Sequence, residues 1–268
     1  MPETDGLHYE IHGEPYAPPL ILSAGLGGSA SYWAPNISTL ARHFRVIDYD
    51  HRGTGRSGRE PPGPIAIEDM AKDVLGLMDA LGIGQASFMG HALGGIIGLS
   101  LAMEAPDRLT RLAVINGWAQ LDPYTARCFD VRLALLRNSG PEAYLQAQPI
   151  FLYPPAWTSA NHQRLEAEAI EQLVHFPGRA TVEKRIAALR AWHPGPALTA
   201  ITLPVLILAT ADDALVPSHA ARALGALLPN HVRVLQPSGG HASNVTEPEE
   251  FHERVVPWLI GISQVQEA

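Results

Sequence analysis

The chain lacks the residues on which disulfide and zinc chemistry commonly depend. Cys128 is the only cysteine among its 268 residues, so an internal disulfide and a cysteine-based zinc site are both excluded. Basic residues are also in deficit, because 19 Lys and Arg stand against 27 Asp and Glu and leave a formal net charge of -8. This balance argues against nucleic acid and against an anionic membrane surface as partners.

Long uncharged segments are scarce as well. One such stretch, residues 83–103, is long enough to raise a membrane question, but it contains Gln85 and His91 and is interrupted by glycines. We therefore expect a buried strand followed by a buried helix.

The N-terminus is acidic and has no apolar signal-peptide segment, which predicts a cytoplasmic protein. Hydrophobic residues make up 46% of the chain and charged residues 17%, a composition typical of a globular protein with a sizeable core.

The most informative absence is a serine. Residues 87–95 follow the pattern of a nucleophile elbow, G-x-S-x-G, in which a serine lies on a strained turn between a strand and a helix. Gly90 and Gly94 hold the outer positions, but Ala92 stands where the serine would be. A methyl group cannot attack a carbonyl. The segment therefore predicts a fold and excludes the simplest mechanism that accompanies it.

Short apolar runs alternate with amphipathic stretches through most of the chain. We expect strands at residues 7–12, 19–23, 45–50, 111–116, 204–209 and 231–235, and helices at residues 67–81, 219–228 and 248–262. This alternation predicts an α/β fold with a mostly parallel central sheet and helices on both faces.

Residues 118–200 break this alternation, because they contain helical patterns and no strand-forming runs. Loop signals fall at Pro141, at residues 153–155 and at residues 194–196. We expect residues 1–117 and 201–268 to form the α/β core and residues 118–200 to form an all-helical cap insertion. Such a cap would cover the carboxyl ends of the strands, where α/β proteins bind ligands.

Two residues near the end of the chain are candidates for proton transfer. Asp213 follows the strand at 204–209, and although Asp212 competes with it, the D-x-x-x-P spacing favours Asp213; its alternative role is to cap the following helix. His241 lies among small residues on a loop after the last strand, where a lone histidine is usually just solvated. The order elbow, acid, histidine is typical of α/β-hydrolases, and it favours a catalytic pair.

An anion-binding site is also predicted around the elbow. Glycines at residues 25, 27 and 28 follow the strand at 19–23 and permit a tight turn that points backbone N–H groups inward. The N–H groups of Leu26, beside Gly25, and of Leu93, at the start of the elbow helix, would then form an oxyanion hole. A plain glycine-rich turn is the alternative for this loop.

With these motifs the chain resembles the α/β-hydrolase superfamily over nearly its whole length, and within it the hydrolases of pyrimidine utilisation. The cap segments are the specific part of the resemblance, since superfamily members diverge most there. The matching stretches are residues 25–29, 31–33, 50–57, 90–94, 116–118, 127–129, 147–149, 151–154, 164–168, 239–242 and 244–246. The resemblance implies that Ala92 is the native residue. A serine hydrolase trapped by a Ser-to-Ala change would have the same sequence and is an alternative.

The resemblance implies hydrolysis of a small C–N compound released in uracil breakdown, either carbamate or 3-aminoacrylate. The His241–Asp213 pair would supply acid–base catalysis without a serine nucleophile, and no cofactor or metal is expected. Both compounds are anionic, so we expect an arginine of the cap to bind them, with Arg127 and Arg132 as candidates beside Trp118. The alternative, which the usual exposure of arginine favours, is that both are solvated helix-surface residues. A homodimer is possible.

Other functions fit parts of the same pattern. A cofactor-free lyase or oxygenase could use the same histidine and aspartate, and a binding protein with a dead site could also have lost its serine. A binding protein would be expected to lose His241 or Asp213 as freely as the serine. Their joint presence favours an enzyme.

Overall fold

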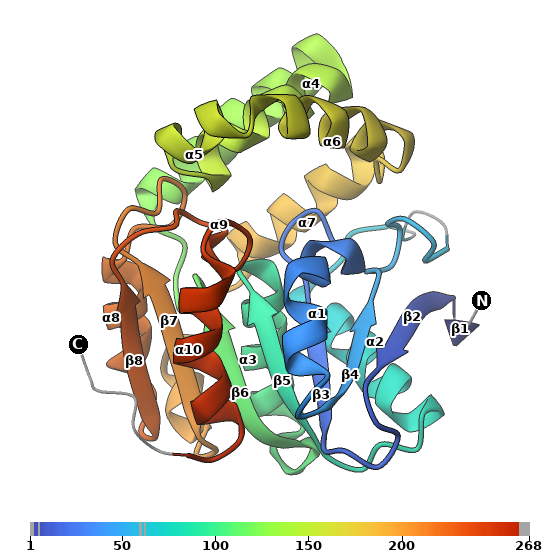
Figure 1. Cartoon of the computed structure of the whole chain (residues 1–268), viewed down its shortest axis with the longest axis vertical. Coiled ribbons are helices and arrows are strands. Elements are labelled where there is room, and N and C mark those ends of the chain that lie inside the picture. The colour runs from blue at the N-terminus through green and yellow to red at the C-terminus, as the bar shows by residue number, and fades with distance from the viewer. Residues whose placement is uncertain (1–2, 5, 59–60, 62, 263–268) are drawn as a thin grey trace.

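The computed structural model describes residues 3–4, 6–58, 61 and 63–262, in which the strands form a single eight-stranded sheet (Figure 1). The strand order is β1-β2-β4-β3-β5-β6-β7-β8. Strands β3 to β8 run parallel, whereas β1 and β2 are antiparallel to their neighbours. The strands are β1 (Glu3–Thr4), β2 (Leu7–His12), β3 (Pro19–Ser23), β4 (Arg45–Tyr49), β5 (Ala86–His91), β6 (Leu109–Ile115), β7 (Val205–Thr210) and β8 (His231–Gln236).

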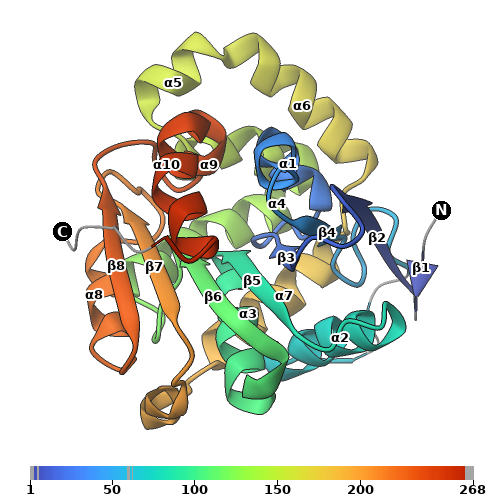
Figure 2. The ribbon, with the colours of Figure 1, turned by 60° about the horizontal axis from the view of Figure 1, so that its bottom comes forward.

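Helices cover both faces of the sheet, as Figures 1 and 2 show. On one face lie α1 (Ala34–Leu40) and α10 (Pro248–Leu259), which pack against each other. On the other lie α2 (Ile67–Ala80), α3 (Leu93–Glu104) and α8 (His219–Gly225). The short α9 (Ser243–Thr246) precedes α10. A mostly parallel sheet needs this double cover, because its strands are apolar on both sides.

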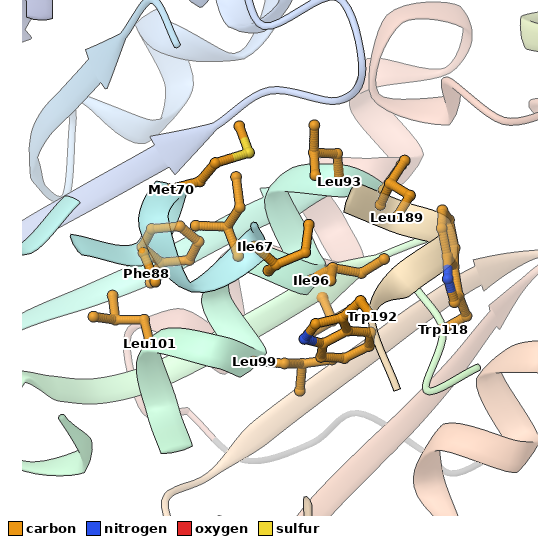
Figure 3. Close-up of a cluster of buried hydrophobic side chains, with 14 of the residues drawn as sticks. Ile67, Met70, Phe88, Leu93, Ile96, Leu99, Leu101, Trp118, Leu189 and Trp192 are labelled. Atoms are coloured by element: carbon orange, nitrogen blue, oxygen red, sulfur yellow. The ribbon is translucent and has the colours of Figure 1, made fainter. Parts of the chain in front are cut away.

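The two faces of the strands feed two separate apolar cores, since neighbouring side chains on a strand point in opposite directions. Ile21 and Phe88 belong to the core beneath α2 and α3, whereas Leu22 and Met89 belong to the core beneath α1 and α10. Figure 3 shows part of the larger core, to which Leu93 of the elbow helix belongs together with Trp118 and Leu189. The start of α3 is therefore held by packing as well as by its turn.

Four helices lie between β6 and β7 and form the insertion above the sheet in Figure 1. They are α4 (Pro123–Leu152), α5 (Pro155–Ala160), α6 (His162–Val174) and α7 (Arg179–Ala191). The break predicted at Pro141 is confirmed one residue earlier, because two helical halves of α4 meet at a kink at Gly140, whose φ of 86° and ψ of −179° are not helical. Gly140 supplies the positive φ, and Pro141 is suited to begin the second half of the helix. The break predicted at residues 153–155 is confirmed, since α4 ends at Leu152 and α5 begins at Pro155.

The sequence predictions agree with the observed elements to within a few residues at each end. The long uncharged stretch divides into β5 and α3, as expected, and Ala92 separates the two. None of the described helices is both long and apolar enough to cross a membrane. The first and last residues assigned to the core, 1–2, 5 and 263–268, lie outside the described part of the chain.

Candidate active site

The turn between β5 and α3 has the geometry of a nucleophile elbow. Ala92 has φ 47° and ψ −109°, a backbone conformation that is costly for any residue with a Cβ. A Cβ on Gly90 would lie 2.2 Å from the carbonyl carbon of Gly94, and a Cβ on Gly94 would lie 2.2 Å from the backbone oxygen of Ser23. Both positions therefore require glycine. The structure keeps the strained turn although the side chain at its apex is only a methyl group.

Asp213 and His241 form a buried hydrogen-bonded pair. Oδ2 of Asp213 lies 2.7 Å from Nδ1 of His241, and Oδ1 of Asp213 accepts the N–H groups of Leu215 and Val216 at 2.7 and 2.8 Å. The exposed fractions of the two side chains are 0% and 3%. A carboxylate held in this way favours the tautomer with hydrogen on Nδ1 of His241, which leaves Nε2 able to accept a proton.

The neighbouring carboxylate of Asp212 has a different task. It accepts the N–H of Gly240 at 2.9 Å and that of Gly239 at 3.3 Å. Both glycines have positive φ, 116° for Gly239 and 69° for Gly240, so the loop before His241 needs them. Asp212 thus fixes the loop that presents His241, and Asp213 fixes the imidazole itself.

The backbone of His241 is tied to the elbow and to β6. Its carbonyl oxygen accepts hydrogen bonds from Nε2 of His91 and from Nδ2 of Asn116, each at 2.7 Å. The rings of His91 and His241 also meet edge to face, with 4.5 Å between their centroids. Asn116 itself has a positive φ of 49°, and its Oδ1 accepts the N–H of Thr210.

Sequence reasoning did not identify Asn116 as part of this site. Its only signal is a polar residue at the end of a buried parallel strand. That position brings it beside the neighbouring strand end at Thr210 and beneath the His241 loop.

His91 is kept neutral by its surroundings. Burial lowers its pKa well below the usual value, and the proximity of His241 lowers it further. Because Nε2 donates to the His241 carbonyl, Nδ1 is unprotonated, and it has no hydrogen-bond partner among the described residues. A Cβ on Gly25 would approach this nitrogen to 2.9 Å, so glycine at position 25 lets the loop pass close to the His91 ring. His91 therefore joins the elbow, the glycine loop and the His241 loop.

The glycine loop forms a tight turn in which the N–H of Gly28 bonds to the carbonyl of Gly25 at 3.0 Å. Leu26 occupies the first central position of this turn, where an N–H group is not used by the turn itself. Leu93 is the first residue of α3, and the N–H groups of a first helical turn have no partner within the helix. Neither the turn nor the helix uses these two N–H groups, and their role as an anion site stays a prediction.

A residue of the cap that sequence reasoning missed holds this loop in place. Arg185 of α7 is fully buried and donates to the carbonyls of Leu26, Gly27 and Arg52 and to Oγ1 of Thr54. Burial lowers the pKa of Arg185 to about 10. The pattern of α7 gives no sign of this role, because an arginine on a helix is usually solvated.

The cap candidates fall into different environments. Arg127 is exposed on α4, which removes it as a substrate-selecting residue, because a ligand under the cap needs a buried donor. Arg132 is buried, with an exposed fraction of 3%, and Trp118 is buried with its ring 6.5 Å from that of Phe129. Arg127 is the solvated arginine that the alternative interpretation described.

One group of described residues could hold a metal ion by the proximity of its ligand atoms. It consists of Glu10, His12 and Asp48, on β2 and β4. None of the residues placed at the elbow, the acid loop or the histidine loop belongs to these strands. The group is therefore separate from the candidate active site.

Comparisons with known proteins agree with this geometry. The profile described as the alpha/beta hydrolase fold matches residues 18–248. A protein of Caulobacter vibrioides named "Putative carbamate hydrolase RutD" is 50% identical over 260 residues, which cover 96% of this chain and 97% of that protein. A protein of the same name from Agrobacterium fabrum is 46% identical and covers 96% and 100%.

Solved structures show the same architecture. An enol-lactonase from Burkholderia xenovorans superposes with a TM-score of 0.86 at 32% identity and covers 94% of this chain and 96% of that one. A thermophilic esterase from Thermogutta terrifontis gives a TM-score of 0.82 at 26% identity, with 96% and 94% covered. The chain therefore belongs to the RutD family of α/β hydrolases.

Proposed function

We propose that the protein releases ammonia from a small anionic C–N compound, carbamate or 3-aminoacrylate, without forming a covalent intermediate. One observation carries the proposal: the elbow has Ala92 at its apex, while the His241–Asp213 hydrogen bond of 2.7 Å is intact beside it. The names of the RutD relatives, which describe carbamate hydrolysis, support the same chemistry. A site of this kind can move protons and stabilise charge, and both substrates require only these two actions.

For carbamate, the reaction is a protonation followed by a bond cleavage. The protonated His241 gives a proton to the carbamate nitrogen, the C–N bond breaks, and its electron pair stays with nitrogen. The products are ammonia and carbon dioxide, and no atom is transferred to the protein. Asp213 stabilises the imidazolium before it donates, because its carboxylate is buried against Nδ1 of His241.

For 3-aminoacrylate, water takes part. A proton is added to C2, which converts the enamine into an iminium at C3, and water then adds to C3 while His241 removes a proton from it. The proton that His241 took from water passes to the amino nitrogen, the hydroxyl of the resulting carbinolamine loses its proton, and the C–N bond breaks with its electron pair on nitrogen to give malonic semialdehyde and ammonia. As the carbinolamine oxygen loses its proton, the N–H groups of Leu26 and Leu93 can stabilise the developing negative charge.

Both substrates also decompose without a catalyst, so the protein needs to lower the barrier only modestly. General acid–base catalysis typically contributes about 10²–10⁴-fold, which is sufficient for such a reaction. A serine nucleophile would add an acyl-enzyme step that neither reaction contains. The alanine at position 92 is therefore compatible with turnover rather than a sign of inactivity.

Ammonia release from each freshly generated compound tests the proposal, with the protein-free rate subtracted. Carbon-13 spectra of the same samples distinguish carbon dioxide and bicarbonate from malonic semialdehyde. We expect the folded protein to accelerate one of the two reactions and the heat-unfolded protein to accelerate neither. Rates equal to the spontaneous rates for both compounds would contradict an enzymatic function.

A further inference from the structure

The cap contributes two buried arginines, and their partners differ. Arg185 donates to four oxygens around the glycine loop. Arg132 uses only Nη2, which donates to the hydroxyl of Tyr144 at 2.8 Å and to Oε1 of Gln148 at 3.0 Å. Of the five N–H donors of a guanidinium, three on Arg132 have no partner among the described residues, and the Nε atom is fully buried.

No carboxylate of the described chain lies within ion-pair distance of Arg132. Its guanidinium carbon lies 5.1 Å from the ring centre of Tyr144 and 5.7 Å from that of Phe151, so aromatic faces supply part of the compensation. Burying a cation without a counter-ion is nevertheless expensive, and the buried Nε without a partner adds to the cost. A bound anion would remove both penalties.

The neighbours of Arg132 on α4 contact both the acid loop and the histidine loop. One turn before Arg132 on α4, Sγ of Cys128 lies 3.9 Å from the carbonyl of Ala214, next to Asp213. Burial raises the pKa of the Cys128 thiol, and two charged groups act on it in opposite directions: Arg132 lowers the pKa and Asp213 raises it. Both charges therefore lie within electrostatic reach of this one side chain.

The other half of α4 reaches the histidine loop. Phe151 lies against the Arg132 guanidinium, and the carbonyl of the next residue, Leu152, accepts the N–H of Ala242 at 3.1 Å. Ala242 directly follows His241. The kink at Gly140 separates the two halves of α4, of which the first has Cys128 by the acid loop and the second has Leu152 by the histidine loop; Arg132 lies one turn after Cys128 and against Phe151.

We propose that Arg132 binds the carboxylate of the substrate, with Tyr144 and Gln148 holding the guanidinium in place. This inference rests on the proposed function, because it assigns a ligand to the same site. The guanidinium N–H donors of Arg132 and the backbone N–H groups of Leu26 and Leu93 come from different elements. A substrate that uses both needs a carboxylate separate from its reacting carbon, which 3-aminoacrylate has and one-carbon carbamate lacks.

Binding of malonate, with its uncharged analogue malonamide as the matched probe, tests this assignment without turnover. Calorimetric titrations at constant ionic strength would compare wild type, Arg132→Gln, Arg132→Lys and the exposed control Arg127→Gln. We expect malonate to bind wild type and Arg127→Gln equally, and Arg132→Gln about 10- to 100-fold more weakly. Arg132→Lys keeps the charge and should fall between them, which keeps the test valid if Arg132→Gln does not fold. Malonamide should bind none of them measurably.

Three results would overturn the assignment: no binding of malonate to wild type, equal binding to both Arg132 variants and wild type, or equal binding of malonamide and malonate. Titration of His241→Ala separates this inference from the proposed function. Malonate binding that is kept in His241→Ala and weakened in both Arg132→Lys and Arg132→Gln, together with a wild type that releases ammonia only at the spontaneous rate, would support the site and contradict the function. If wild type releases ammonia above the spontaneous rate and Arg132→Lys has the same KM as wild type, the result would support the function and contradict the site.

Discussion

The elbow and the acid–base loops form two halves of one site, and only the second half has side chains that can take part in a reaction. At the elbow, Ala92 retains the strained backbone but has no reactive group. In the acid–base half, Asp213, His241, Asp212 and Asn116 are all hydrogen-bonded into one network. Strained backbone and buried polar groups persist where the surrounding structure holds them in place. This difference supports our proposal that the site supplies proton transfer and anion binding rather than nucleophilic attack.

The adjacent carboxylates Asp212 and Asp213 allow the role of the acid in proton transfer to be tested separately from its role in loop structure. Asp213→Asn can no longer stabilise the imidazolium and favours the wrong tautomer, so we expect kcat/KM for ammonia release to fall by about 10²–10⁴-fold. Asp212→Asn keeps one acceptor oxygen for the Gly239 and Gly240 N–H groups, so its rate should fall by less than about 10-fold. Steady-state kinetics of both variants checks this order. Equal losses for the two would show that Asp213 acts only through the loop structure.

Arg185 tests whether the cap holds the anion-binding loop. Arg185→Met would leave four oxygens around the glycine loop without their donor. We expect the free energy of unfolding to fall by about 2–4 kcal/mol, measured by urea denaturation. Arg179→Met, an exposed arginine on the same helix, should change it by less than about 0.5 kcal/mol. An equally small effect for Arg185→Met would mean that the loop does not depend on the cap.

Two buried histidines whose pKa is lowered, His51 after β4 and His91 at the elbow, predict that the protein loses stability in acid. Burial lowers the pKa of His51 and His91 well below 6.5, so near pH 6 the unfolded chain takes up protons that the folded protein does not. The stability they contribute is complete above pH 6.5 and is lost as the pH falls below it, by up to about 1.4 kcal/mol per pH unit for each histidine. Urea unfolding between pH 5.5 and 7 measures this slope. His91→Asn should reduce it, whereas exposed His193→Gln should not, and a flat profile for wild type would contradict the prediction.

Restoring the serine hydroxyl at position 92 is expected to change the activity of the protein least. Ala92→Ser adds a hydroxyl to a turn that already has the elbow geometry, beside a histidine and backbone N–H donors. We expect weak hydrolysis of p-nitrophenyl acetate and an acetylated protein detectable by mass spectrometry. A folded variant that is never acetylated would show that the rest of the triad geometry is incomplete.

Local sequence patterns were sufficient for the fold and for the acid–base pair. Alternating apolar runs fixed the strands, because parallel strands buried on both faces leave little freedom in composition. Asp213 and His241 were found from chain order, and Ala92 from the spacing of Gly90 and Gly94. Each of these signals lies within a short segment or in the order of segments, so it can be recognised without knowledge of the tertiary structure.

Residues that act across long sequence separations could not be found in this way. Arg185 contacts a loop about 160 residues earlier in the chain, and Asn116 meets the backbone of His241 125 residues later. The sequence also could not distinguish exposed Arg127 from buried Arg132, because both lie on the first half of α4. Arg132 donates to Tyr144 and Gln148 of the second half, and the kink at Gly140 determines what that half covers. Burial of a charged side chain depends on tertiary packing rather than on local pattern.

The most direct test of the central claim is the rate of ammonia release by wild type, His241→Ala and His193→Ala, each compared with the protein-free rate. His193 is exposed and serves as the matched control. We predict that wild type and His193→Ala exceed the spontaneous rate equally and that His241→Ala returns to it. A His241→Ala protein that is as fast as wild type, while both exceed the spontaneous rate, would contradict the account.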